Sequence, residues 1–440
     1  MFTSSTFSGA TIMRRYYQFA LACAFLIIGT KTEGQTAASV STPPAVNDTI
    51  RTLVSRLDLE RYKATLRGLQ RFGDRRQGTS RNRAAIDWIE AQLKSYGCNN
   101  TERITYEFLG RQVQNDSTRR FDSLARAAKG LPPLPTRRPF VPPTASAKGG
   151  IRYDRYGNII KGNVAPTGVN MNPLLQPDTA LRRIDMEPDT PGERQEVFCT
   201  KVGSVHPNEM YIVGGHMDGH GYGAALNDDG SGTALVMELA RVFNSPDVTT
   251  DRSIRFILWN NEETGLNGSR AYVDQRQSLQ GVENPRGSGK YPEPKWLGMI
   301  QHDMMMWDHG MPGPDGKVSS EQRREADVNV EFAGESKLAD ESEKLAWTFR
   351  RANEHYATDY PAAVGNRMSN TDSDPFKDLC PTISLRENER LAQTGTGWNP
   401  TWHQPIDVYS TFSDKDFRLG LNAAQTTLAA VAELAGARLK

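Results

Sequence analysis

The sequence has few cysteines and almost no net charge. Only four of its 440 residues are cysteine, and Cys23 lies in a hydrophobic run, which leaves Cys98, Cys199 and Cys380 further along the chain. None of these pairs has the spacing of a metal site, and any one pair, or none, is compatible with a disulfide. The net charge of +1 gives no reason to expect a nucleic-acid or anionic-membrane partner.

Several catalytic signatures are also missing. The sequence contains no HExxH pair, so it does not support a single-zinc endopeptidase of the zincin type. It contains no nucleophile-elbow serine motif either. The glycine-rich run at residues 230–232 is not followed by the lysine of a phosphate-binding loop, so nucleotide binding is not indicated.

Long hydrophobic runs are scarce, and the one near the amino terminus is too short to span a bilayer comfortably. Arg14 and Arg15 precede this run, Phe19–Ile28, and small and polar residues follow it. This order matches the basic, hydrophobic and cleavage regions of a signal peptide, to which we assign residues 1–38. We therefore expect a secreted or periplasmic protein without stable membrane insertion after the signal is removed.

The first part of the mature chain predicts helices and then a long insertion. Apolar residues recur at helical spacing between Asn47 and Tyr96, and Arg103–Phe108 alternates like a strand. Between about residues 109 and 195 prolines and arginines replace periodic apolar positions, apart from a possible hairpin near Ile151–Ile160. Such stretches are either disordered or form functional lids, and the sequence leaves both open. The sequence carries no signal for the oligomeric state.

From Glu196 onwards strands alternate with helices, which predicts an α/β fold. We expect a three-layer sandwich, with a central mixed, mostly parallel sheet covered by helices on both faces. Residues 45–440 would form a single catalytic domain that includes the insertion. The predicted strands are Val197–Val202, Tyr211–Val213, Ser253–Trp259, Trp296–Gln301, Asp327–Phe332 and Pro381–Leu385, and the predicted helices are Gly232–Phe243, Gly268–Val273, Lys337–His355 and Asp414–Leu439.

Acidic and imidazole side chains follow the ends of several predicted strands. His216 and Asp228 follow the strand ending at Val213, and Glu262 and Glu263 follow the next strand along the chain. Asp303 follows a third strand, and His403 comes late in the chain after a loop. Because the carboxyl ends of parallel strands meet at one edge of a sheet, these groups should converge.

Four carboxylates brought together without cations would repel one another, and some would have to hold protons. Two divalent ions, roughly 3.5–4 Å apart and bridged by one carboxylate, would remove this repulsion. Imidazole and carboxylate without thiol are ligands that suit zinc and similar ions. Two imidazoles and three carboxylates suffice to hold both ions, which leaves a fourth carboxylate free to move a proton.

The motifs GGHMDG, NDDGSG, NNEETGLNGS, HDM and WHQPID resemble, in this order, those of the secreted di-zinc aminopeptidase family, peptidase family M28. Relatives of that family include glutamate carboxypeptidase, the transferrin receptor and glutaminyl cyclase. The resemblance covers residues 196–440 and the helical segment that starts at Asn47. Each motif alone has a structural explanation, such as a turn at residues 228–232 with Ser231 capping a helix or first-turn acids at Glu262 and Glu263.

The resemblance implies a role for each of these residues. His216 and Asp303 would bind one zinc, Glu263 and His403 the other, and Asp228 would bridge the two Zn²⁺ ions of each chain. Glu262 would be the general base. Asp218 would hydrogen-bond the second nitrogen of His216, and Asp407 would do the same for His403. Ser373 and Asp374 fall where the family lines its substrate pocket, and the Asp228–Asp229 peptide bond is expected to be cis.

The function implied is that of a secreted metallo-exopeptidase acting on peptide substrates. An aminopeptidase that uses a metal-bridging water is the first interpretation, because the simple secreted members of the family have this activity. The alternatives are a carboxypeptidase for acidic dipeptides, a glutaminyl cyclase with one zinc, and a binding protein without catalysis.

Overall fold

The computed structural model describes residues 47–110, 152–153, 159–160, 169–308, 328–387, 399 and 401–440. The signal peptide predicted at residues 1–38 lies outside these ranges, as does most of the stretch assigned as an insertion. Residues Val46–Lys440 cluster as one unit. Within the described ranges, no helix has the length and apolar character needed to cross a lipid bilayer.

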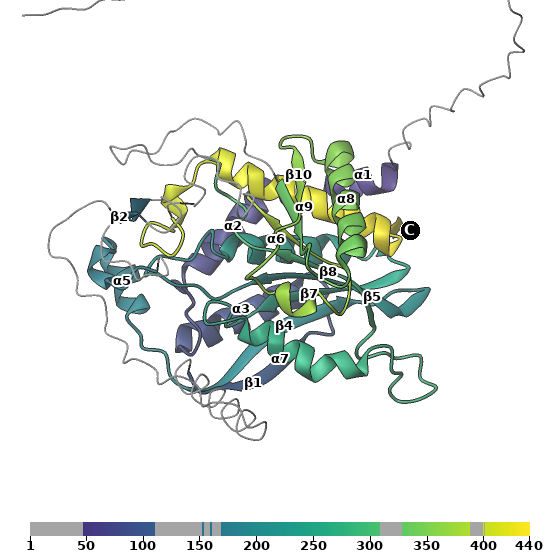
Figure 1. Ribbon diagram of the computed structural model, residues 1–440, viewed down its shortest axis with the longest axis horizontal. Coiled ribbons are helices and arrows are strands. Elements are labelled where there is room, and N and C mark those ends of the chain that lie inside the picture. Colours follow the sequence, from purple (N-terminus) through teal and green to yellow (C-terminus); the bar gives the residue numbers. More distant parts are fainter. Residues whose placement is uncertain are drawn as a thin grey trace, which may run out of the picture. The chain divides into compact units, whose positions relative to one another are not determined.

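One mixed sheet occupies the middle of this unit (Figure 1). The central strands β7, β5, β8 and β11 run parallel to one another, whereas β4 pairs antiparallel with β1 and β7, and β9 pairs antiparallel with β11. The mostly parallel sheet is therefore confirmed. In sheet order the strands are β1 (Glu102–Phe108), β4 (Gly192–Lys201), β7 (Arg252–Trp259), β5 (His206–His216), β8 (Lys295–His302), β11 (Thr382–Arg386), β9 (Val328–Phe332) and β10 (Ala362–Gly365).

Helices cover both faces of the sheet because successive side chains of a strand point to opposite faces. Along β4, Val197 and Cys199 pack in the larger core with helices α1, α2, α3, α6, α8 and α9, whereas Phe198 packs in a second core with α7 (Figure 1). The three-layer arrangement is therefore confirmed. The helices are α1 (Asp48–Val54), α2 (Leu59–Gln70), α3 (Ser80–Ser95), α5 (Thr179–Asp185), α6 (Gly230–Phe243), α7 (Asn267–Arg276), α8 (Ala339–Tyr356) and α9 (Asp414–Ala435).

Shorter elements complete the unit. The hairpin predicted near residues 151–160 is present as the antiparallel pair β2 and β3. The last helix ends four residues before the prediction, because Gly436 adopts a left-handed conformation (φ +66°) and the chain continues into a short strand. These elements are β2 (Arg152–Tyr153), β3 (Ile159–Ile160), β6 (Val248–Thr249), β12 (Arg438–Leu439) and the 3₁₀ turns η1 (Pro173–Leu175), η2 (Gln277–Leu279), η3 (Asp374–Phe376) and η4 (Tyr409–Thr411).

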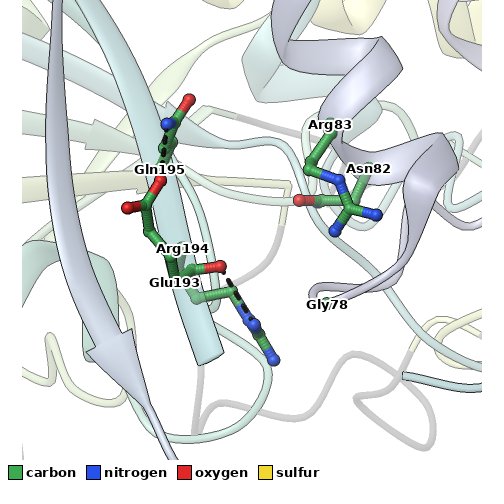
Figure 2. Close-up of a pocket in the computed structure, with 6 residues that line it drawn as sticks. All are labelled: Gly78, Asn82, Arg83, Glu193, Arg194 and Gln195. Carbon is green, nitrogen blue, oxygen red and sulfur yellow. Dashed lines mark hydrogen bonds between the residues drawn. The ribbon is translucent and has the colours of Figure 1, made fainter. Parts of the chain in front are cut away.

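A small cavity lies between α3 and β4 (Figure 2). The space in it that is open to the centre of a water-sized sphere is about 30 Å³, which exceeds the roughly 10–15 Å³ that one water molecule needs. It is too small for a peptide, and none of the candidate ligands lines it. The lining residues are Gly78, Asn82, Arg83, Glu193, Arg194 and Gln195.

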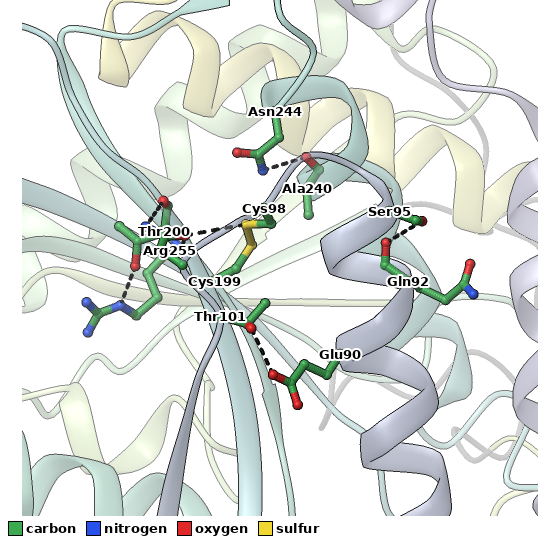
Figure 3. Close-up of a disulfide and its surroundings, with 11 residues drawn as sticks. Glu90, Gln92, Ser95, Cys98, Thr101, Cys199, Thr200, Ala240, Asn244 and Arg255 are labelled. Carbon is green, nitrogen blue, oxygen red and sulfur yellow. Dashed lines mark hydrogen bonds between the residues drawn. A yellow bond between two sulfur atoms is a disulfide. The ribbon is translucent and has the colours of Figure 1, made fainter.

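One disulfide ties the helical segment to the sheet (Figure 3). It joins Cys98, just after α3, to Cys199 in β4, across a sequence separation of 101 residues. Cys380 remains a buried free thiol. The structure thus selects one of the pairings that the sequence left open.

Candidate metal centre

Five side chains from separate parts of the chain meet beyond the carboxyl ends of neighbouring strands. His216 is the last residue of β5, and Asp228 lies in the loop between β5 and α6. Glu263 follows β7, Asp303 follows β8, and His403 lies in the loop before α9. The expected convergence at one sheet edge is present, since β7, β5 and β8 are parallel neighbours.

The ligand atoms of these side chains form two groups of three that share Asp228. One group holds His216, Asp228 and Asp303, the other Asp228, Glu263 and His403, and within each group the atoms lie within 4.8 Å of one another. The Oδ1 of Asp228 is 3.3 Å from the Nε2 of His216, and its Oδ2 is 3.0 Å from the Nε2 of His403. Asp228 therefore offers one oxygen to each group.

The imidazole nitrogens of the two groups lie close to carboxylate oxygens without forming hydrogen bonds of good geometry. The Nε2 atoms of His216 and His403 are buried and have no hydrogen-bond partner among the described residues. Carboxylate oxygens nevertheless lie close to them, such as the Oε2 of Glu263 at 2.8 Å from His403. Buried polar atoms are normally hydrogen-bonded, so these two unpaired imidazole nitrogens, each among carboxylate oxygens, fit ligands of a zinc-like cation.

Asp218 supports both groups, although not as the sequence indicated. The nearer partner of the His216 Nδ1 is the backbone carbonyl of Asp218, at 3.0 Å, whereas the carboxylate is 3.7 Å away. The Asp218 carboxylate accepts hydrogen bonds from the backbone N–H groups of Glu262 (3.1 Å) and Glu263 (3.4 Å). This one residue therefore fixes the imidazole ring and also the loop that follows β7.

The expectation for Asp407 is wrong. Its carboxylate accepts hydrogen bonds from the backbone N–H groups of Asn227 (2.8 Å) and Asp228 (3.2 Å). The Nδ1 of His403 has no hydrogen-bond partner in the described ranges. Asp407 is four residues past His403, but the two lie in a turn rather than a helix, so its side chain is free to reach the neighbouring loop.

Asp229 joins three elements at the centre. Its peptide bond with Asp228 is cis, as expected from the family resemblance. Its carboxylate accepts hydrogen bonds from the N–H groups of Gly232, His216 and Met304, at 2.9–3.1 Å. Asp229, rather than Ser231, is therefore the cap of α6, and it binds this helix to the ends of β5 and β8.

Glu262 is buried beside the two groups, with 9% of its surface exposed. Burial raises the pKa of its carboxyl group well above the ordinary value, His216 opposes this shift, and the charge of Glu263 adds to it. A carboxylate with a raised pKa, next to but outside the ligand groups, can accept and return a proton.

Three further residues near the centre were not assigned to it from the sequence. Arg386 donates from Nη2 to the Oδ2 of Asp303 at 2.7 Å, and an arginine that ends an otherwise uncharged, buried strand could have signalled this. His220 contacts the carbonyl oxygen of Glu263 through its Nε2 at 3.2 Å. Burial raises the pKa of Asp372 to about 7, with the charges of Asp218 and Asp303 adding to the shift.

The pair predicted to line a substrate pocket is engaged elsewhere. The hydroxyl of Ser373 shares a hydrogen bond with that of Ser384 (2.7 Å), and Asp374 accepts one from the Nζ of Lys377 (2.9 Å). Of the acids in this loop it is Asp372 that is affected by His216 and Asp218, so it lies closer to the centre.

Known proteins share both sequence and fold with this chain. A family model described as Peptidase family M28 matches residues 197–427. Aminopeptidase YwaD of Bacillus subtilis is 45% identical over 69 residues, which are 16% of this chain and 14% of that protein. The match thus spans about a seventh of the relative's length.

Two solved structures resemble the fold. The zinc aminopeptidase BSAP of Bacillus subtilis superposes with a TM-score of 0.54 and 17% identity, covering 86% of this chain and 95% of that one. An aminopeptidase from Aneurinibacillus sp. strain AM-1 gives a TM-score of 0.53 and 18% identity, covering 89% and 97%. At this level of identity the similarity establishes the fold alone.

Proposed function

The chain belongs to peptidase family M28, and on that premise we propose that it is a di-zinc aminopeptidase that removes amino-terminal residues from peptides. One observation carries the proposal, namely the two groups of three ligand atoms that share Asp228. The aminopeptidase activity of similar proteins supports the choice among exopeptidases.

His216 and Asp303 would hold one zinc, Glu263 and His403 the other, and Asp228 would contribute one oxygen to each. A bound zinc pair polarises the scissile carbonyl group and lowers the pKa of a nearby water molecule. The unpaired Nε2 atoms of both histidines and the absence of thiols from these groups support zinc as the metal.

The remaining chemistry belongs to Glu262. In the proposed reaction its carboxylate takes the proton from the attacking water and passes it to the leaving amine. Asp218 holds the backbone of Glu262 and Glu263 through its carboxylate, which keeps the base and one ligand in a fixed relation. Arg386 holds Asp303 through its side chain, by donating a hydrogen bond to the Asp303 carboxylate.

We place the mature protein outside the cytoplasm. The sequence of residues 1–38 supports this location through its signal-peptide pattern. The Cys98–Cys199 disulfide supports it independently, because disulfides persist in oxidising compartments.

The replacement Glu262→Gln tests the proposal. We expect about 10²–10⁴-fold slower hydrolysis of aminoacyl-anilides with two zinc ions retained per chain, because the amide cannot accept the proton yet Glu262 binds no ion. The neighbouring Glu263→Gln variant is the matched control and should lose zinc as well as activity. Wild-type turnover by Glu262→Gln would refute the assignment of the base.

Metal content and substrate choice separate the alternatives. Elemental analysis of the wild-type chain should give two zinc ions, whereas one ion would favour a glutaminyl cyclase. Assays with aminoacyl, carboxyl-terminal and amino-terminal glutaminyl substrates, each with and without chelator, should show chelator-sensitive release of amino-terminal residues only. Turnover of another substrate class alone would overturn the aminopeptidase proposal.

A further inference from the structure

The segment from Val169 to Gln176, which we name the strap, carries two buried amide side chains. Asn170 has no exposed surface, and Gln176 is 2% exposed. Burial of an amide is unfavourable unless its polar atoms are hydrogen-bonded. The partners of these two amides therefore indicate what the strap holds in place.

Asn170 contacts two loops of the candidate metal centre. Its backbone N–H donates to the carbonyl oxygen of His403 at 3.0 Å. Its Nδ2 donates to the carbonyl oxygen of Gly221 at 3.2 Å. One residue of the strap thus binds the loop of His403 and the loop that follows β5.

Gln176, at the end of the strap, also contacts both loops. Its Nε2 donates to the carbonyl oxygens of Tyr222 and Pro405, both at 2.8 Å. Both residues of the strap therefore bridge the same two loops, residues 219–223 and 401–407, Gln176 through its side chain alone and Asn170 through its side chain and its backbone N–H.

The two loops also contact each other through their backbones. Gly221 has φ +95°, and a Cβ atom there would lie 2.2 Å from the carbonyl oxygen of His403. A Cβ atom on Gly223 would lie 2.6 Å from the carbonyl oxygen of Gln404. Glycine permits this close approach of the two loops. The strap adds hydrogen bonds to each of them.

His403 needs such support because its ring lacks the usual one. Histidine ligands normally donate their other ring nitrogen to a carboxylate, a carbonyl group or water, which orients the ring. The Nδ1 of His403 has no partner within the described part of the chain. The ring stacks on Trp402, with 4.1 Å between centroids, and the backbone of His403 adopts a left-handed conformation (φ +55°).

We infer that Asn170 and Gln176 are positioning residues that orient His403 for the second zinc through the backbone of its loop. The inference rests on the proposed function, because it assumes that His403 and Glu263 hold an ion. The first group has different supports, the Asp218 carbonyl and Arg386, so loss of the strap contacts should weaken one zinc selectively.

The test is the double variant Asn170→Asp/Gln176→Glu. Each change keeps the side-chain oxygen that accepts from a backbone N–H group, that of Asn172 for position 170 and that of Asp178 for position 176, and removes the donating NH₂ group. The backbone N–H of residue 170 keeps its bond to His403. The control Asn172→Asp adds one negative charge to the strap, as Gln176→Glu alone does, and keeps its bond from the Leu174 N–H group. Stepwise zinc affinities of the metal-free full chain would be measured by chelator competition, with thermal unfolding of the metal-free chain as a check on folding.

We expect one zinc to bind about 10–100-fold more weakly in the double variant, with the other zinc unchanged and Asn172→Asp like wild type. Unchanged affinities, or equal loss at both sites, would overturn the role of the strap. If the double variant does not fold, Gln176→Glu alone should show the same selective loss. A wild-type chain that binds fewer than two zinc ions would instead contradict the proposed function, whatever the variants do.

Discussion

His403 and the carboxylates beside it show how charge is balanced at single residues. Burial lowers the pKa of this imidazole, but the charge of Glu263 and the contacts with Asp228 and Glu263 outweigh burial and raise it to about 10. Burial raises the pKa of Asp228, and the contacts with His216 and His403 outweigh it, so that its net pKa is lowered. In the metal-free chain, protons on the imidazoles thus neutralise charge that cations would otherwise neutralise.

This balance predicts opposite effects of pH on the metal-free and zinc-loaded chains. The pKa of His403 rises on folding from its ordinary 6.5 to about 10. Its protonated form therefore stabilises the metal-free fold below about pH 6.5, and this contribution is lost as pH rises to about 10. We expect the unfolding temperature in chelator to fall across this range and zinc affinity to rise, because zinc must displace the proton.

Calorimetry at several pH values, with chelator and with zinc, would measure this effect. The His403→Gln variant is the control and should show a smaller decline between pH 6.5 and 10, because of the two imidazoles only His216, whose pKa is also raised well above its ordinary value, still contributes. An identical decline in that variant would show that another group titrates.

The residues of the candidate centre were predictable because each lies in a recognisable motif, and all except His403 follow a predicted strand. Their supports were not, since side-chain direction in loops does not follow from spacing. Asp407 was expected to contact His403 and instead binds the backbone of Asn227 and Asp228. The partner of Asp303 is Arg386, 83 residues away in sequence, and local patterns carry no information on such a contact.

At the scale of elements, the N-cap residue of α6, Asp229, stabilises more than the helix itself. Asp229 accepts from Gly232 at the start of α6, from His216 at the end of β5 and from Met304 just past β8. Each of these donors is buried. The carboxylate therefore fixes the relative positions of one helix and two strands at the edge where the candidate ligands lie.

The variant Asp229→Ala should destabilise the metal-free chain by on the order of 3 kcal/mol or more, because three buried N–H groups would each lose a partner. Asp178, which caps α5 at a more exposed position, provides the comparison, and Asp178→Ala should cost about 1 kcal/mol. Urea unfolding in chelator measures both. Equal small losses would mean that water replaces the Asp229 carboxylate.

Most elements follow from apolar periodicity, and the exceptions have clear reasons. Strand β7 and helix α8 were predicted to within a few residues, because β7 is a nearly continuous apolar run that is buried on both faces and the buried positions of α8 follow the period of a helix. Strand β10 was missed because its sequence, AAVG, offers four small or β-branched residues and no alternation. Helix α5 and the strap were missed because they lie in a stretch whose prolines and arginines suggested an irregular insertion.

At the scale of the whole molecule, the disulfide closes a long loop. Cys98 and Cys199 are separated by 101 residues, a span that contains the insertion and the strap. In the chain-entropy model a cross-link across about 100 residues stabilises the fold by about 4.7 kcal/mol, because it restricts the unfolded chain. The chain's stability should therefore depend on the redox state of its surroundings.

We predict that reductant lowers the urea midpoint of the wild-type chain, and that Cys98→Ala/Cys199→Ala loses about 2–5 kcal/mol of stability and no longer responds to reductant. The free thiol of Cys380 is present in both proteins, so it cannot account for a difference between them. Urea titrations with and without reductant measure the effect. Because zinc would bind the folded chain, the titrations need chelator throughout. A wild-type midpoint that does not move on verified reduction would mean that the loop between α3 and β4 is constrained in the unfolded chain without its cross-link.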